Sequence, residues 1–364
     1  MTADTDSPSL TGVRAGRRRY AAIAIVVALG AIAVALFGRP QHVVGPRSVQ
    51  LEGAVGEASF SPDGRLIASQ RFSATQEPEL VIYDANTGAI VRTVHLGTSA
   101  GFCRGVRFSP DGRSVVTASG GLAITDVATG KSRSLGTLPR VGTVDTAFAP
   151  DGRLISASAA GIGRSGPAFT WFFDTKTMKR VDAWTYPMHL VGPAEFAPDG
   201  KSVLIQPFGG TAQLLGYPSK RPIATFPEDR SQAYRGAAFL PGGRDVSVFT
   251  REGDLCIWTP TTGAIRELRH DTLPGLTPVA YSADGRFVVA NVVKMPTTLN
   301  PELPGGQPRF RVTVFDTRTG AALHSVAASL ADPVVDLAIA PDGKAVAVFT
   351  ASGDYGTCRL YRWR

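Results

Sequence analysis

The sequence predicts an all-β protein, a seven-bladed β-propeller with four strands in each blade, on three observations. The hexapeptide Phe60–Arg65 (FSPDGR) comes back six more times in similar form, with copies that start at Phe108, Phe148, Phe196, Phe239, Tyr281 and Ile339. The starts lie 40 to 58 residues apart, a period typical of propellers and solenoid arrays. A second turn signature follows most copies, and four β-favouring stretches fit into one period.

The first repeat illustrates the four strands. Ala58–Phe60 ends the first strand, and Ser61–Gly64 is a turn with Pro and Gly at the positions that a type I turn prefers. Leu66–Gln70 and Leu80–Tyr83 read as the second and third strands, and Ala89–Leu96 alternates enough to be a half-exposed fourth strand.

Aspartates recur in the turns and have a structural explanation. The first turn carries Asp63, Asp111, Asp151, Asp199, Asp284 and Asp342. In the second signature an aromatic residue and Asp precede Thr-Gly, in full at 83–88 and 315–320 and in part at 126–130, 173–174 and 258–263. A turn Asp accepts hydrogen bonds from nearby backbone amides. A residue that recurs in nearly every unit is therefore expected to stabilise turns rather than to act in catalysis or metal binding.

These motifs resemble a WD-repeat propeller over residues 47–364. The aromatic-Ser-Pro-Asp-Gly turn is similar to that of the bacterial WD40-like and TolB-like propellers. The chain departs from the eukaryotic pattern, because it has no regular Gly-His dipeptide and has Tyr-Asp or Phe-Asp where that pattern has Trp-Asp. The resemblance implies a ring fold, and no His–Asp network is carried over from the family.

The two ends of the repeat region predict how the ring closes. The last repeat stops after a third strand near Arg359–Tyr361, and Arg47–Leu51 precedes the first complete repeat as an orphan fourth strand. Pairing of Val49–Leu51 with Arg359–Tyr361 would complete the last blade and leave no inner edge unpaired.

The N-terminus predicts a membrane anchor. Tyr20–Phe37 is uncharged over 18 positions, which would span about 27 Å as a helix and nearly match a bilayer core of about 30 Å. We therefore expect a disordered basic cytoplasmic tail at 1–19, a transmembrane signal anchor at 20–37 and a linker at 38–46. Arginines concentrated before the apolar run place the propeller outside the cytoplasm. The alternative is a cleaved signal peptide with Ala33–Ala35 as the cleavage site.

Composition excludes some classes of function. The net charge is +8, of which +3 comes from five Arg and two Asp in residues 1–40, and the rest is spread over the repeats. Charge spread in this way favours a solvated rim over nucleic-acid binding. The cysteines Cys103, Cys256 and Cys358 fall in different blades, so we expect buried thiols rather than a disulfide framework.

Motifs of catalysis and of cofactor binding are missing, so we predict no enzyme, no cofactor and no metal site. The G-x-G-x-x-G match at 161–166 precedes Pro167 and a strand instead of a helix, which indicates a loop. The histidines stand singly, at His42, His95, His189, His270 and His324, without the spacing of metal ligands.

Three long connections between second and third strands point to a binding face. They are Arg71–Pro78, Ala159–Ala168 and Asn291–Arg309, and in a propeller they emerge opposite the Pro-Asp-Gly turns. Loops of this length are usually functional or disordered. The candidate binding residues on this face are Phe102, Tyr186, His189, Arg230, Tyr234, Arg235, His270, Lys294 and Met295.

Together these features predict a bacterial, single-pass membrane protein whose extracytoplasmic propeller is a non-catalytic scaffold for a protein or peptide of the cell envelope. The alternative is an enzyme or small-ligand-binding propeller, lactonase-like or dehydrogenase-like, with its site at the central channel. A spacer without a specific ligand is the third interpretation.

Overall fold

The computed structural model describes most of residues 46–364. The described ranges are 46–97, 104–118, 121–136, 138, 144–160, 167–187, 194–207, 211–227, 236–250, 254–269, 279–294, 309–328, 333–351 and 356–364. The predicted tail at 1–19, anchor at 20–37 and nearly all of the linker at 38–46 lie outside them. Within the described part, no helix has the length and apolar character needed to span a membrane.

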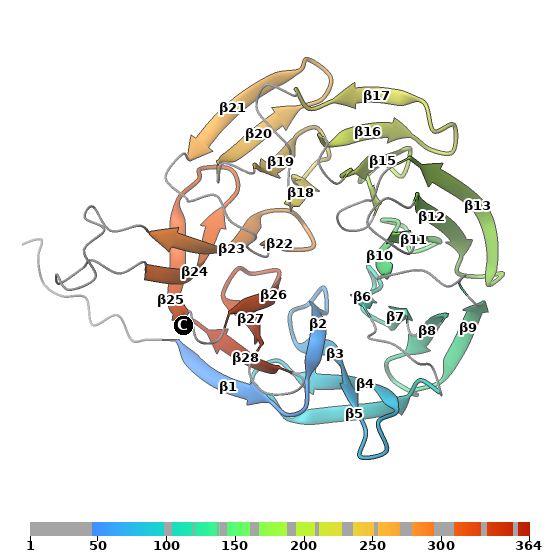
Figure 1. Ribbon diagram of the computed structural model, residues 1–364, viewed down its shortest axis with the longest axis vertical. Coiled ribbons are helices and arrows are strands. Elements are labelled where there is room, and N and C mark those ends of the chain that lie inside the picture. Colours follow the sequence, from blue (N-terminus) through green and yellow to red (C-terminus); the bar gives the residue numbers. More distant parts are fainter. Residues whose placement is uncertain are drawn as a thin grey trace, which may run out of the picture. The chain divides into compact units, whose positions relative to one another are not determined.

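Seven antiparallel sheets of four strands each form the blades of a ring (Figure 1), which confirms the predicted seven-bladed propeller. The inner strands are β2 (Val55–Phe60), β6 (Arg104–Phe108), β10 (Val144–Phe148), β14 (Glu195–Phe196), β18 (Gly236–Phe239), β22 (Val279–Tyr281) and β26 (Val334–Ile339). The second strands are β3 (Leu66–Phe72), β7 (Ser114–Ala118), β11 (Leu154–Ala160), β15 (Ser202–Ile205), β19 (Val246–Phe249), β23 (Phe287–Lys294) and β27 (Ala345–Thr350).

The remaining strands lie farther from the axis of the ring. The third strands are β4 (Pro78–Asp84), β8 (Leu122–Asp126), β12 (Ala168–Asp174), β16 (Gln213–Gly216), β20 (Leu255–Thr259), β24 (Arg309–Asp316) and β28 (Thr357–Arg362). The outer strands are β5 (Ile90–His95), β9 (Ser132–Gly136), β13 (Lys179–Tyr186), β17 (Pro222–Thr225), β21 (Ala264–Arg269), β25 (Ala322–Ala328) and β1 (Arg47–Leu51). Blades are numbered 1 to 7 from β2–β5 onward, so that β1 belongs to blade 7.

Strand direction gives the ring two different faces. Because each strand runs opposite to the next, the turns from inner to second strand and from third to outer strand share one side, which we call the turn face. The connections from second to third strand, and from one blade to the next, share the other side, which we call the loop face.

The ring closes as predicted, because β1 pairs with β28. Leu51 is opposite Cys358 and Arg47 is opposite Arg362 in this ladder. The neighbouring blade also holds the closing strand, since the buried Tyr83 hydroxyl donates to the Glu52 carbonyl at 2.8 Å. The N-terminal strand thus completes blade 7 and is fixed to blade 1 as well.

The aspartates named above hold the inner turns. In the first turn the Arg65 amide donates to Asp63 Oδ1 at 3.0 Å, and the Ser61 hydroxyl donates to the same oxygen at 2.6 Å. The equivalent amide bond is made by Asp111, Asp151, Asp199, Asp284 and Asp342. One carboxylate oxygen therefore fixes each of these turns locally.

The outer turns use the second signature. Asp84 Oδ1 accepts from the Thr87 amide at 2.8 Å and from the Thr87 hydroxyl at 2.9 Å, and the turns of blades 2, 3 and 6 repeat this pattern. Blade 3 lacks the glycine, and Met178 takes the left-handed conformation there with φ 59°. The turn after Phe173-Asp174 is therefore complete, although its sequence keeps only part of the signature.

Apolar side chains fill the spaces between blades. One cluster joins blades 7 and 1 through Phe60, Tyr83, Ala338, Phe349 and Cys358, and Cys256 is likewise buried. Polar bonds also cross between blades, such as Thr146 Oγ1 to the Gly105 carbonyl at 2.9 Å. The core therefore lies between the sheets of neighbouring blades, and outer strands such as β5 and β17 stay largely exposed.

The strands beside the three predicted connections take in one to four residues at each end of the predicted ranges. The β3–β4 ladder continues to Phe72 opposite Pro78, β11–β12 to Ala160 opposite Ala168, and β23–β24 to Lys294 opposite Arg309. The error has a physical reason, because β-branched residues such as Val292 and Val293 keep the chain extended beyond the blade.

Candidate functional site

The paired second and third strands of blades 1, 3 and 6 run toward the loop face, and we call these pairs the three stems: β3 with β4, β11 with β12, and β23 with β24. The stem of blade 6 goes farthest beyond its inner strand. β22 reaches only Ala290, whereas β23 stays paired with β24 through Lys294. In Figure 1 this hairpin, β23 and β24, extends outward beyond the neighbouring blades. The connection at 295–308 is therefore mounted on paired strands.

Side-chain contacts stiffen the stems. In blade 1, Arg71 on β3 forms an ion pair with Glu79 on β4 at 2.7 Å, and His95 on β5 lies 3.1 Å from the other carboxylate oxygen of Glu79. Three adjacent strands are thus tied together at the loop face. In blade 6, both Nε and Nη2 of Arg311 donate to the Ser325 hydroxyl, at 3.1 and 2.6 Å.

Two of the predicted binding residues lie in described strands, and the structure places neither in a loop. Tyr186 ends β13, but its ring is buried, and Nζ of Lys220 from the outer turn of blade 4 lies 4.6 Å from the ring centroid. Lys294 is the last residue of β23 rather than part of the connection that follows. A contact role for either residue stays a prediction.

The other predicted binding residues fall outside the described ranges: Phe102, His189, Arg230, Tyr234, Arg235, His270 and Met295. The G-x-G-x-x-G match at 161–166 does so too. The prediction that these residues form one binding patch is untested by the fold.

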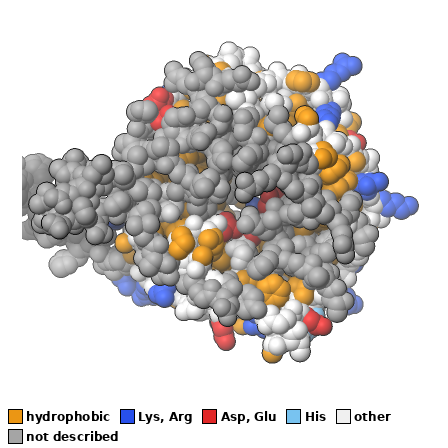
Figure 2. Space-filling model, in the orientation of Figure 1, with side chains coloured by type: hydrophobic (Ala, Val, Ile, Leu, Met, Phe, Trp, Pro, Cys, Tyr) orange, Lys and Arg blue, Asp and Glu red, His pale blue; other side chains and the backbone are white. Residues whose placement is uncertain are grey.

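The inner strands carry a group of charged side chains that the sequence analysis did not single out. We call it the axial group, and its members are Glu57, Arg107, Asp145, Glu195 and Asp336. Figure 2 shows acidic side-chain atoms near the middle of the molecule, where the inner strands of Figure 1 surround the axis. The axial group thus gathers residues from five different blades.

An ion pair between blades 1 and 2 is the best-defined part of the axial group. The Arg107 guanidinium donates to Glu57 Oε1, and the Gly105 amide donates to Glu57 Oε2 at 2.5 Å. Glu57 is buried, and a buried charge is costly unless it is paired. The hydrogen bonds to both carboxylate oxygens compensate the charge of Glu57.

Local backbone irregularity helps to aim these side chains. The ladders of β2 and β3, of β6 and β7, and of β26 and β27 each shift register just before or at a charged residue, between Val55 and Ala58, Arg104 and Arg107, and Val334 and Asp336. A bulge of this kind redirects a side chain and is common beside functional sites.

Electrostatics couple the members of the axial group. Burial lowers the pKa of Arg107, but the carboxylates of Glu57, Asp145 and Asp336 outweigh that effect and keep the pKa above its usual value. Burial raises the pKa of Glu195 to about 7, although the positive charge of Arg107 acts in the opposite direction. Glu195 is therefore a group that exchanges a proton near neutral pH.

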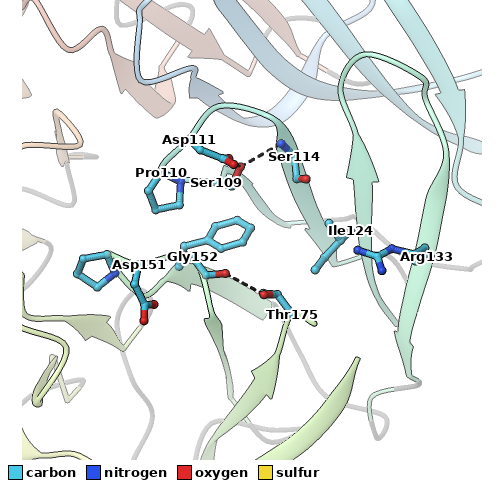
Figure 3. Close-up of a pocket in the computed structure, with 11 residues that line it drawn as sticks. Ser109, Pro110, Asp111, Ser114, Ile124, Arg133, Asp151, Gly152 and Thr175 are labelled. Atoms are coloured by element: carbon cyan, nitrogen blue, oxygen red, sulfur yellow. Dashed lines mark hydrogen bonds between the residues drawn. The ribbon is translucent and has the colours of Figure 1, made fainter. Parts of the chain in front are cut away.

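A hollow of about 420 Å³ lies on the turn face (Figure 3). It lies between the inner turns of blades 2 and 3, with Pro110 on one side and Asp151 on the other. Its carboxylates already serve their own turns, since Asp111 accepts from the Arg113 amide and Asp151 from the Arg153 amide. The hollow is therefore a groove between repeated turns.

Among the described residues, no three His, Cys, Asp or Glu side chains come close enough together to hold a metal ion. Comparison with known proteins adds no assignment, because no family model and no curated protein matches this chain. The stems and the axial group are thus the two arrangements from which a function can be argued.

Proposed function

We propose that this protein is a membrane-anchored, extracytoplasmic scaffold that binds a protein or peptide of the cell envelope on the loop face of its propeller. The observation that carries the proposal is the set of three stems. The paired strands continue past the last pair of the inner strand by four residues in blade 6, two in blade 1 and one in blade 3, and they do so on one face.

Stems of this kind favour recognition of a macromolecule. Paired strands fix the residues at which each connection begins and ends, which lowers the entropy that is lost when a partner binds. The contacts of Arg71 with Glu79 and of Arg311 with Ser325 add rigidity near these residues. Binding residues carried on loops and positioned by a rigid scaffold are a general feature of such folds.

The anchoring part of the proposal comes from residues 20–37. Their uncharged run is long enough for a bilayer, and the arginines before it orient the chain with the propeller outside the cytoplasm. The similarity of the turn motif to bacterial WD40-like and TolB-like propellers agrees with a binding role in the envelope.

The test is crosslinking of the full-length protein in its native membrane, followed by purification. A variant in which a short Gly-Ser linker replaces Thr297–Gln307 is treated in the same way. The proposal predicts that the natural protein captures a specific protein and that the variant captures at least tenfold less. Unchanged capture by the variant would show that residues 297–307 are not part of the binding site, and no captured protein in either case would overturn the scaffold proposal.

A matched control separates loss of binding from loss of the ring. Lys131→Gln and Arg133→Gln change exposed residues at the turn-face end of blade 2. This double variant should capture as much partner as the natural protein, and all three proteins should have similar melting temperatures.

The axial group supports a second candidate function, binding of a small ligand at the central channel. Glu195, whose pKa is raised to about 7, is the specific observation, since perturbed groups in a cleft are candidates for functional sites. Native mass spectrometry of the purified protein would detect such a ligand. Glu195→Gln and Asp145→Asn should then lose it, whereas a ligand retained by both variants would rule out this site.

A further inference from the structure

The point of ring closure has a hollow of its own, of about 290 Å³. We call it the closure hollow, and it is lined by Arg47, Val49, Asn86, Leu360, Arg362, Trp363 and Arg364. Three of these seven residues are arginines, which come from both ends of the propeller sequence. Closure of the ring therefore creates this concentration of positive charge.

The arginines lack neutralising partners in the described structure. Arg47 and Arg362 are directly opposite each other in the β1–β28 ladder, an arrangement of like charges that destabilises a sheet. The ion pairs found among the described residues involve none of the three arginines.

The polar groups around the hollow leave its charge largely uncompensated. Arg362 Nη1 lies 3.5 Å from the Ala85 carbonyl, which uses one of its five donors. Asp84 is close enough for Arg362 to contribute to lowering its pKa, but the Thr87 amide and hydroxyl make the larger contributions. That carboxylate is committed to its own turn.

The closure hollow lies on the turn face. β1 begins there and β28 ends there, and Asn86 belongs to the turn that follows β4. Trp363 stays in position because its ring stacks on His324, with centroids 4.9 Å apart. Figure 2 shows basic side-chain atoms at the lower-left rim, beside the place where Figure 1 draws the start of β1 and the C-terminus.

The chain outside the described residues joins the propeller at the same place. Arg47 follows Pro46 directly, and only residues 38–46 separate it from the end of the apolar run. Nine residues span at most about 30 Å when fully extended. If residues 20–37 cross a bilayer, as proposed above, the closure hollow lies within reach of the lipid surface.

We infer that the closure hollow binds the phosphate groups of anionic phospholipids in the membrane that holds the anchor. A guanidinium presents paired donors that match phosphate oxygens, and three of them in one hollow complement a surface of such phosphates. An anionic membrane surface also attracts basic side chains that lie close to it. The bound phosphate separates Arg47 from Arg362 electrostatically, and it brings the turn face to the lipid while the loop face stays open to a partner.

This inference rests on the proposed anchor, so its test must separate the two. Full-length protein is first extracted from membranes with alkaline carbonate, and retention in the membrane pellet establishes the anchor. The protein is then reconstituted in nanodiscs that contain equal amounts of phosphatidylglycerol and phosphatidylcholine. Native mass spectrometry counts the lipids that remain bound after release from the nanodisc.

The key variant is Arg47→Gln with Arg362→Gln and Arg364→Gln. The natural protein should retain phosphatidylglycerol over phosphatidylcholine, and the variant should lose that preference at least fivefold while staying in the carbonate pellet. The control is Arg153→Gln with Arg221→Gln and Arg266→Gln, which removes the same charge elsewhere on the ring and should keep the preference. Equal lipid retention in all three proteins would overturn the inference.

Two further outcomes are informative. Release of the natural protein by carbonate would contradict the anchor and, with it, the lipid surface proposed here. Displacement of the bound lipid by millimolar inorganic phosphate, without any preference between lipids, would identify the ligand as free phosphate and overturn the lipid assignment. The melting temperature of the key variant checks its folding, and it should equal or exceed that of the natural protein because a repulsive pair has been removed.

Discussion

Aspartate is the residue that fixes both kinds of turn in the ring. The Ser61 hydroxyl lowers the pKa of Asp63 and the Ser109 hydroxyl lowers that of Asp111. In the outer turns, hydrogen bonds from Thr87 and Thr129 lower the pKa values of Asp84 and Asp126. The ionised form of each residue is the form that stabilises its turn.

The ring should therefore lose stability in acid. A carboxyl whose pKa is lower in the folded state stabilises fully above its unfolded pKa of about 4 and loses that effect as the pH falls through the lower, folded value. We expect these aspartates to add no change in melting temperature between pH 7 and pH 5 and to make it fall steadily below pH 4. Substitution of Asp63 and Asp111 by Asn should make the fall less steep, and an identical acid profile in that variant would contradict the assignment.

Glu195 should behave in the opposite way. Its pKa of about 7 lies above the unfolded value of 4.5, so its effect on stability is most favourable below pH 4.5 and becomes a cost as the pH rises through 7. Glu195→Gln should leave the free energy of unfolding unchanged at pH 4.5 and raise it by about 1–3 kcal/mol at pH 8. Urea denaturation at both pH values measures this difference.

Glu57, which is paired with Arg107, should respond to substitution in the opposite way to Glu195. Glu57→Gln removes a charge that Arg107 and the Gly105 amide already satisfy, so it should destabilise the ring at pH 8. A stabilising effect of Glu57→Gln, or a destabilising effect of Glu195→Gln at pH 8, would contradict the description of the axial group.

The turn aspartates can be predicted from the sequence more readily than the members of the axial group. The turn aspartates can be recognised because their partners lie within three positions in the chain. The members of the axial group stand about forty residues or more apart, and only the closed ring brings them to one axis. A charged residue inside an otherwise small and apolar inner strand, such as Glu57 or Asp336, was the one available signal.

Among the elements, the closing strand is the one that the rest of the ring depends on. Leu51 is fully buried against blades 7 and 1, and Tyr83 binds the carbonyl just after it. Deletion of residues 47–52 should lower the melting temperature sharply, and Leu51→Ala alone should cost about 2–5 kcal/mol in the free energy of unfolding. Chemical denaturation measures both effects, and an unchanged midpoint in the deletion variant would sink the closure account.

The outer turn of blade 1 leaves no space for a side chain at its glycine, whereas the outer turn of blade 5 does. Gly88 has φ 71°, and a Cβ there would collide with Val49 Cγ1 on the closing strand. Gly263 has φ 72°, but a Cβ there would meet nothing within 4 Å. Gly263→Ala should cost about 1 kcal/mol for the backbone alone, whereas Gly88→Ala should cost about 1–3 kcal/mol more. Equal melting temperatures for the two variants would contradict the close approach of β1 to blade 1.

Element boundaries were predictable where turn residues mark them. The turns Ser61–Gly64 and Asp84–Gly88 contain Pro, Asp or Gly at restrictive positions, and the strands next to them begin and end close to the predicted residues. The stems were not predictable in the same way, since prolines and polar residues around 295–308 masked the extended character of Val292 and Phe310. Pairing with a partner strand, which a single segment does not reveal, decides how far such a strand continues.

At the scale of the whole molecule, the two faces of the ring have different chemistry. The stems rise on the loop face, while the closure hollow and the attachment of the N-terminal segment lie on the turn face. This division supports a scaffold that is held at one face and recognises a partner with the other. The scaffold role itself is the central claim, and it predicts where a partner makes contact.

Site-specific photocrosslinking in the native membrane tests that claim most directly. A photoreactive amino acid would replace, one at a time, the exposed Thr75 and Ala351 on the loop face and the exposed Lys176 and Thr262 on the turn face. The account predicts that at least one loop-face position crosslinks to a defined protein and that neither turn-face position does. Crosslinks to that protein from the turn face alone, or protein crosslinks from none of the four positions, would contradict it.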